Sequence, residues 1–192
     1  MDGQNLFHAA REAFHHRVPD YDILALGRAL CRPRRWQLMQ TRFYTGFPTV
    51  SASPFWARFW ERKLARLGRK GVVTFSRPLR YRNHTVRLPD ATTFTMRTAE
   101  EKGVDVRIAL DVIRLAHRRV FDVALVVSQD QDFAEVASEI RVIAREQHRW
   151  IKIASAFPLG PATRNRRGIN GTDWIPIEQE TYERCIERIA PA

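Results

Sequence analysis

Acidic side chains that could act together occur in three separate segments of the 192-residue chain. They are Asp2, Asp105, Asp130 and Asp132. Two like charges about 4 Å apart repel by roughly 4 kcal/mol at an effective dielectric constant of about 20, so carboxylates that converge need a cation between them. Hard oxygen ligands select Mg²⁺ or Mn²⁺ over zinc. Such an ion lowers the pKa of a bound water and can hold a phosphodiester for in-line attack, so the pattern indicates metal-assisted hydrolysis.

Asp130 and Asp132 directly follow an apolar run at residues 123–127, which is typical of a strand covered on both faces. We therefore expect both side chains at the carboxyl edge of a parallel sheet, where open α/β sheets bind ligands. Each residue also has a simpler interpretation. Asp132 with Glu135 forms a capping box at a helix start, and Asp130 could serve only in the turn.

Asp105 falls on the face of a predicted helix that also carries Ile108 and Val112, and this face is expected to be buried. A carboxylate there is costly unless it is paired or bound to a cation, although the first helical turn favours negative charge. Asp111 lies at the edge of the same apolar arc. It could support the site or be solvated, and we expect it to be solvated.

The first residues contain Gly3, which permits a tight turn, and Asn5, which can cap the following helix. Turns are rich in these residue types, so this segment alone is weak evidence. His15 and His16 are adjacent in sequence and expected on the surface. The chain has no nucleophile elbow, P-loop or dinucleotide-binding glycine pattern.

The elements that must position these side chains alternate between helical and extended patterns, which predicts an α/β fold with a mainly parallel sheet. The predicted helices are residues 5–17, 22–30 (capped by Asp20 or Asp22), 54–67, 104–118 and 133–148, with a last turn or two near the end. The predicted strands are residues 36–44, 71–76, 123–127, 150–156 and 174–177. Ser53 and Pro54 are expected to open the third helix and Gly68 to end it. Residues 77–98 show no clear period and are predicted to form a basic loop.

The composition is that of one soluble globular domain, with 44% hydrophobic and 28% charged residues. No stretch approaches the roughly 18 apolar residues of a membrane-spanning helix, and the polar start shows no secretory signal. Cys31 and Cys185 are isolated, so we expect two reduced thiols in a cytoplasmic protein. A disulfide scaffold and a structural zinc site are excluded.

The chain carries 32 Lys and Arg against 21 Asp and Glu, a formal charge of +11 that a polyanionic partner would exploit. The candidate nucleic-acid contacts are Arg58, Arg62 and Arg66 in the third helix, Arg80 and Arg82 in the basic loop, and Arg164, Arg166 and Arg167 in a basic tail segment at about residues 160–172. Their contacts with phosphate would make affinity fall with salt. The helical row could equally be a solvated face, and Tyr81 could stack on a base or simply pack.

Four motifs in this order resemble those of NYN domains, relatives of the PIN-domain nucleases. They are Asp2-Gly3-Gln4-Asn5-Leu6, Lys102-Gly103-Val104-Asp105-Val106, Ser128-Gln129-Asp130-Gln131-Asp132-Phe133 and Asp173-Trp174-Ile175. The resemblance covers nearly the whole chain. It implies one domain over residues 1–192, a PIN-like three-layer α/β/α sandwich, an acidic Mg²⁺ or Mn²⁺ site and RNA as the substrate.

The resemblance matches the family's acidic positions to Asp2, Asp105, Asp130 and Asp132, and its polar companion to Asn5. Asp111 matches a frequent acidic position to which we assign no role. In the family an apolar strand precedes the first motif and forms the middle of the sheet. Here Asp2 follows Met1, so we expect that strand to be truncated and the true start to lie upstream.

Three functions remain open from the sequence. The first is a metal-dependent ribonuclease acting on single-stranded RNA, in which the four aspartates bind one or two ions and Asn5 orients a water or a phosphate oxygen. The second is a non-catalytic RNA-binding or regulatory module; the intact acidic set counts against it, and the missing strand favours it. The third is a phosphatase of small phosphoesters, for which the basic surface would be unnecessary. A homodimer is also open.

Overall fold

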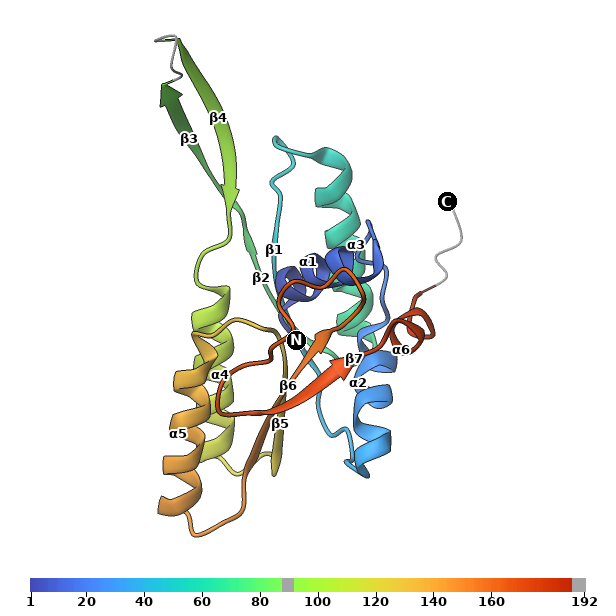
Figure 1. Cartoon of the computed structure of the whole chain (residues 1–192), viewed down its shortest axis with the longest axis vertical. Coiled ribbons are helices and arrows are strands. Elements are labelled where there is room, and N and C mark those ends of the chain that lie inside the picture. Colours follow the sequence, from blue (N-terminus) through green and yellow to red (C-terminus); the bar gives the residue numbers. More distant parts are fainter. Residues whose placement is uncertain (88–91, 188–192) are drawn as a thin grey trace.

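The computed structural model describes residues 1–87 and 92–187, and within them helices alternate with parallel strands (Figure 1). This confirms the mixed α/β class. The helices are α1 (Gly3–Phe14), α2 (Ile23–Cys31), α3 (Pro54–Arg69), α4 (Val104–His117), α5 (Phe133–Glu146) and α6 (Gln179–Glu183), with a 3-10 turn at Arg32–Arg34. The strands are β1 (Arg42–Phe47), β2 (Val73–Pro78), β3 (Arg80–Arg87), β4 (Thr93–Glu100), β5 (Val123–Val127), β6 (Lys152–Pro158) and β7 (Asp173–Ile177).

The parallel strands form two groups, β1 with β2 and β5 with β6 and β7. The first two residues join the groups. The Tyr44 amide donates to the Met1 carbonyl at 3.0 Å, and the Asp2 amide donates to the Val127 carbonyl at 3.1 Å. Asp2 thus forms an isolated parallel bridge with Tyr44 of β1 and is hydrogen-bonded to the last residue of β5.

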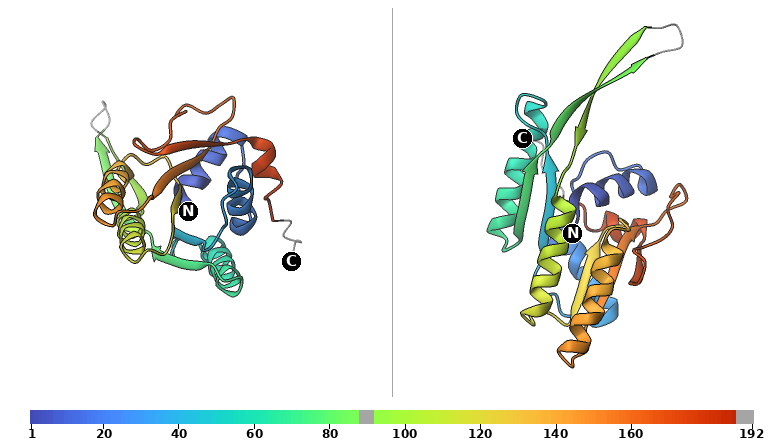
Figure 2. Two further views of the ribbon diagram at one scale, coloured as in Figure 1. Left: turned by 90° about the horizontal axis from the view of Figure 1, so that it is seen from below. Right: turned by 90° about the vertical axis from the view of Figure 1, so that its left-hand side faces the viewer.

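Alternating side chains of β5 face two different hydrophobic cores. Leu125 and Val127 pack in the core that contains α1, α2 and α3, whereas Ala124 and Val126 pack in the core that contains α4 and α5. Figure 2 shows these two sets of helices on opposite sides of the strands. The strand's apolar run is thus explained, because both of its faces are covered.

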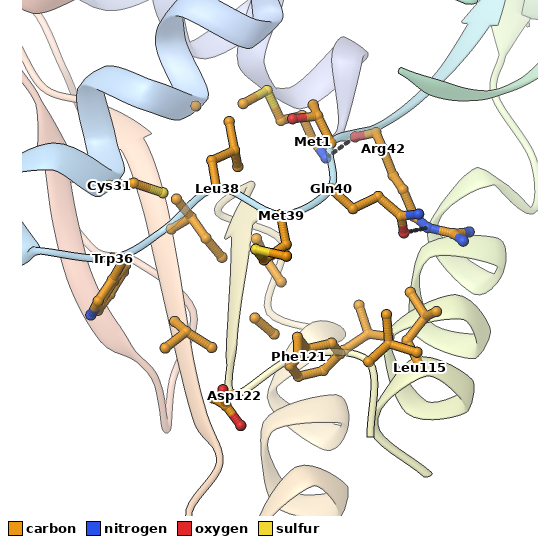
Figure 3. Close-up of a pocket in the computed structure, with 18 of the residues that line it drawn as sticks. Met1, Cys31, Trp36, Leu38, Met39, Gln40, Arg42, Leu115, Phe121 and Asp122 are labelled. Carbon is orange, nitrogen blue, oxygen red and sulfur yellow. Dashed lines mark hydrogen bonds between the residues drawn. The ribbon is translucent and has the colours of Figure 1, made fainter. Parts of the chain in front are cut away.

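A cavity of about 600 Å³ lies below Met1, where the two groups of strands separate. In Figure 3, Met1 and Leu38 lie on one side of it and Leu115 and Phe121 on the other. The predicted strand at residues 36–44 is wrong in its first half, since pairing begins only at Arg42. The Thr41 carbonyl still accepts from the Val73 amide at 3.0 Å, but residues 36–40 pair with no strand of the described chain, and residues 36–41 line the cavity.

The largest error in the predicted elements concerns residues 77–98, which do not form a loop. β3 and β4 pair in antiparallel register, from Arg80 opposite Glu100 to Arg87 opposite Thr93. We call these two strands the arm; they project from the body in Figure 1 and in the right-hand view of Figure 2. Nearly every arm residue is exposed, so neither face shows the alternation that marks a half-buried strand. Residues 88–91 lie outside the described part.

The predicted ends of several elements also shift. Asp22 caps α2 through its side chain, as predicted. Ser53 holds the first cap position of α3 but makes no side-chain bond there, and Gly68 lies inside that helix rather than ending it. Cys31 and Cys185 are buried and unpaired. No helix in the described residues has the length and apolar character needed to cross a bilayer.

Candidate active site

The start of α1 is joined to the turn that follows β5. The buried Asp2 carboxylate accepts one bond from the Asn5 amide at 3.1 Å and another from the Ser128 hydroxyl at 3.2 Å. The Asn5 side-chain oxygen accepts from the Gln129 amide at 3.0 Å. Residues more than 120 positions apart in sequence thus meet at the carboxyl edge of the sheet.

Asp130 lies in the same turn, half-buried. One of its carboxylate oxygens accepts from the Asp132 amide at 3.0 Å, so the turn role proposed for Asp130 is present. Burial raises the pKa of Asp2, and the charge of Asp130 raises it further, against the opposing effects of the bonds from Asn5 and Ser128. The Asp132 side chain is exposed and makes no capping bond to α5, so the capping-box interpretation is wrong.

Glu101 is an acidic residue of this region that sequence reasoning missed. Its carboxylate accepts a hydrogen bond from the Gly46 amide at the end of β1. Burial raises the pKa of Glu101 to about 7, with further contributions from the charges of Asp2 and Asp105. Its position four residues before Asp105 was the signal available in the sequence. This signal was overlooked because the preceding strands were predicted to be a loop.

Asp105 lies in the first turn of α4 and is half-buried, consistent with its predicted face. The negative charge of Asp105 raises the pKa of Glu101, as the charge of Asp2 also does, so both aspartates act on the same glutamate. Within the described residues, no side-chain hydrogen bond or ion pair joins Asp105 to the turn at Asp130.

Asp111 is not solvated, contrary to expectation, and is only 4% exposed. It accepts hydrogen bonds from Arg42 and from the Tyr44 hydroxyl, both at 2.9 Å, and pairs with Arg107 at 3.1 Å. Burial alone would raise its pKa, but the bonds from Tyr44 and Arg107 more than offset this and lower it. Asp111 therefore links α4 to β1 through its bonds to Arg42 and Tyr44. The helical pattern alone does not reveal this role, because both partners come from another element.

The chemistry of the acidic side chains fits a hard divalent cation. Asp2, Glu101, Asp105 and Asp130 supply only oxygen ligands, and in the described part of the chain none of them forms a salt bridge. Burial is the main cause that raises the pKa values of Asp2 and Glu101, and neighbouring carboxylates raise them further: Asp130 acts on Asp2, and Asp2 and Asp105 act on Glu101. As placed, however, no three His, Cys, Asp or Glu side chains of residues 1–87 and 92–187 are close enough to hold one metal ion.

The basic tail segment is fastened to the turn that contains Asp130. The Gln129 side chain donates to the carbonyls of Asn165 and Arg167, both at 2.8 Å, and the Gln131 side chain donates to the Gly168 carbonyl at 3.0 Å. Arg164, Arg166 and Arg167 are exposed in this segment. Both glutamines were missed from the sequence because side-chain to main-chain bonds of this kind leave no periodic pattern.

The other predicted arginines lie in two places. On α3, Arg58 and Arg62 are exposed, while Arg66 pairs with Glu187 and thus already has a carboxylate partner. Arg80 and Arg82 lie on the arm, with Arg82 at 3.4 Å from Glu100. The predicted arginines therefore lie on three separate segments, namely α3, the arm and the tail segment.

Comparison with known sequences assigns the chain to a family. The family model of the NYN domain matches residues 1–147, which include α1, the turn after β5 and the first turn of α4. Neither a curated protein nor a solved structure gives a significant match. The chain therefore belongs to the NYN domain family, whose members are generally nucleases with a PIN-like α/β fold.

Proposed function

We propose that this protein is a metal-dependent endoribonuclease. The observation that carries the proposal is the bonding of Asp2 to Ser128, which brings the acidic start of α1 to the turn of Asp130 in a chain of a nuclease family. Asp2, Asp105, Asp130 and Asp132 would hold the ion, with Glu101 beside them. A bound Mg²⁺ or Mn²⁺ would supply positive charge at the phosphate and lower the pKa of a coordinated water.

Asn5 has a definite part in this proposal. Its side-chain oxygen is occupied by the Gln129 amide, so the orientation of its amide group is fixed. The NH₂ group then remains available to donate to a phosphate oxygen or a water. Asn5 would thus orient the substrate rather than transfer a proton.

RNA is the substrate we propose, and it would approach across the arginine-bearing tail segment. Arg164, Arg166 and Arg167 are exposed next to the turn of Asp130, held there by Gln129. Guanidinium groups beside an anionic site can offset the repulsion that a phosphodiester meets there. The irregular, exposed segment suits a single strand better than a closed groove for a duplex.

We also propose that the whole chain forms one domain with a three-layer α/β/α arrangement. The matched region ends at residue 147, but β6 and β7 continue the sheet from β5. The two cores on opposite faces of β5 support the layering.

Cleavage of labelled single-stranded RNA tests the nuclease proposal, with Mn²⁺, with Mg²⁺ and with EDTA. Asp130→Asn should abolish metal-dependent cleavage, by about 100-fold or more. Asp122→Asn is the matched control, because Asp122 lies at the opposite end of the same strand and its side chain is 80% exposed. Cleavage that survives EDTA or Asp130→Asn would refute the metal mechanism.

A non-catalytic RNA-binding module is the second candidate, favoured by the absence of an enclosed metal site in the described residues. Salt-sensitive RNA binding without cleavage under every metal condition would establish it instead.

A further inference from the structure

We propose that one face of the arm binds the phosphate backbone of RNA that extends beyond the cleaved bond. This inference rests on the proposed function for its choice of ligand. The arm follows β2 directly and returns through Glu101 to α4, so its root lies at the carboxyl ends of β1 and β2. The Leu79 amide donates to the Phe47 carbonyl at 2.9 Å and fixes that root next to Gly46, whose amide donates to Glu101.

The register of the arm divides its side chains into two unlike faces. Alternate residues of paired strands share a face. The first face, here named the arginine face, carries Tyr81, Asn83, Thr85 and Arg87 of β3 with Thr93, Thr95, Arg97 and Ala99 of β4. It contains no acidic residue.

The second face is chemically different. It also carries two arginines, Arg80 and Arg82, but with them Glu100, which lies 3.4 Å from Arg82 and 3.7 Å from His84, so part of the basic charge of this face is already compensated. Toward the tip it exposes Val86, Phe94 and Met96. A polyanion would therefore favour the arginine face.

Three features prepare the arginine face for phosphate. The guanidinium of Arg97 lies over the Tyr81 ring at 4.5 Å, a stacking contact that restrains it and leaves its in-plane N–H donors free. Among the described residues, no carboxylate lies within ion-pair distance of Arg87 or Arg97. The hydroxyl groups of Thr85 and Thr95, 3.1 Å apart, add further polar groups between them.

The length of the arm sets which RNA can use it. An eight-residue antiparallel strand spans about 27 Å, so an RNA bound at the acidic residues reaches the tip only if it continues for several nucleotides. Long substrates should therefore depend on the arm, and very short ones should not.

The test is RNA binding by Arg87→Gln/Arg97→Gln, measured by fluorescence anisotropy in EDTA so that no cleavage is needed. The matched control is Arg114→Gln/Arg118→Gln, which removes the same charge from exposed positions at the carboxyl end of α4, away from the arm. For single-stranded RNA of about 20 nucleotides, we expect the arm variant to bind at least about 10-fold more weakly. Its salt dependence should fall by roughly 1.4 in slope, for two lost phosphate contacts. The control should stay within about two-fold, and an RNA of about four nucleotides should not distinguish the variants.

Equal losses in both variants, or unchanged binding by the arm variant, would overturn the proposal. A change in oligomeric state on size-exclusion chromatography with unchanged RNA affinity would instead assign the arm to contact between copies of the chain. Because binding is measured without metal, an arm that binds RNA in a protein that never cleaves it would refute the nuclease function and leave this inference standing.

Discussion

The arm and the carboxyl edge of the sheet are built by opposite means. The edge brings Asp2 to Ser128 by contacts between distant parts of the chain, and it is buried against both cores. The arm is held by hydrogen bonds between neighbouring strands of one hairpin and is exposed on both faces. Carboxylates that repel one another need a rigid scaffold to hold them close together. Arginines that bind a nucleic-acid backbone need only be exposed within contact distance of its phosphates. The body should therefore carry the stability of the protein, and the arm should carry little of it.

Two phenylalanines give the largest expected contrast. Phe133, at the start of α5, is 1% exposed, and Phe94, on the arm, is 58% exposed. Phe133→Ala should lower the free energy of unfolding by about 3–5 kcal/mol, because it leaves a cavity in the core. Phe94→Ala should change it by less than about 0.5 kcal/mol. Urea denaturation measures both, and comparable losses would mean that the arm packs as part of the body.

The buried ion cluster at Asp111 should give an intermediate effect. Asp111→Asn removes the negative charge shared by Arg42, Tyr44 and Arg107, and should cost about 2 kcal/mol of stability. Because the pKa of Asp111 is lowered below its usual 3.8, its contribution is present above that pH and is lost as pH falls through the lowered value. The variant should therefore lose less stability on acidification than the native chain.

Asp122→Asn is the matched control for that measurement. Its exposed pair with Arg149 should contribute less than about 1 kcal/mol. Equal losses from Asp111→Asn and Asp122→Asn would show that the cluster at Asp111 does not hold α4 to β1.

The sequence was sufficient for the parts of the site that follow a buried strand. The apolar run of β5 and the turn after it placed Asp130, because that signal is local. The expectation that Asn5 caps the first helix was wrong, since Asp2 is the cap residue of α1 and the Asn5 side chain accepts from the distant Gln129 amide instead. Asp111 was wrongly expected to be solvated, because its partner Arg42 comes from another element and the helical pattern does not predict contacts between elements. The same holds for Gln129 and Gln131, whose partners are main-chain carbonyls of the tail segment.

The arm was misread for a different physical reason. Sequence periodicity reports the difference between a buried and an exposed face, and a ribbon exposed on both faces has no such difference. Its register was nevertheless present in the pairing of β-branched and aromatic residues, such as Thr85 opposite Thr95 and Val86 opposite Phe94. Once the arm was taken for a loop, Glu101 at its end was overlooked.

Glu100 and Glu101 are neighbours in sequence at the point where the arm meets the edge. Their substitutions should give the smallest changes in the free energy of unfolding, but with opposite signs. Glu100 lies near Arg82, His84 and Lys102, whereas Glu101 is affected by the charges of Asp2 and Asp105. The pKa of Glu101 is raised from 4.5 to about 7, so the stability that it contributes is fully present below pH 4.5 and is lost as pH rises through 7.

At pH 8 in EDTA, Glu101→Gln should therefore raise the free energy of unfolding by about 1 kcal/mol, and at pH 5 it should have almost no effect. Glu100→Gln should have the opposite sign at pH 8, a loss of less than about 1 kcal/mol, because it removes exposed ion pairs. Denaturation curves at both pH values measure this. If both variants change the free energy of unfolding at pH 8 in the same direction, Glu101 does not lie in the anionic environment of the edge. Glu101 would then belong with the arm rather than with the acidic residues.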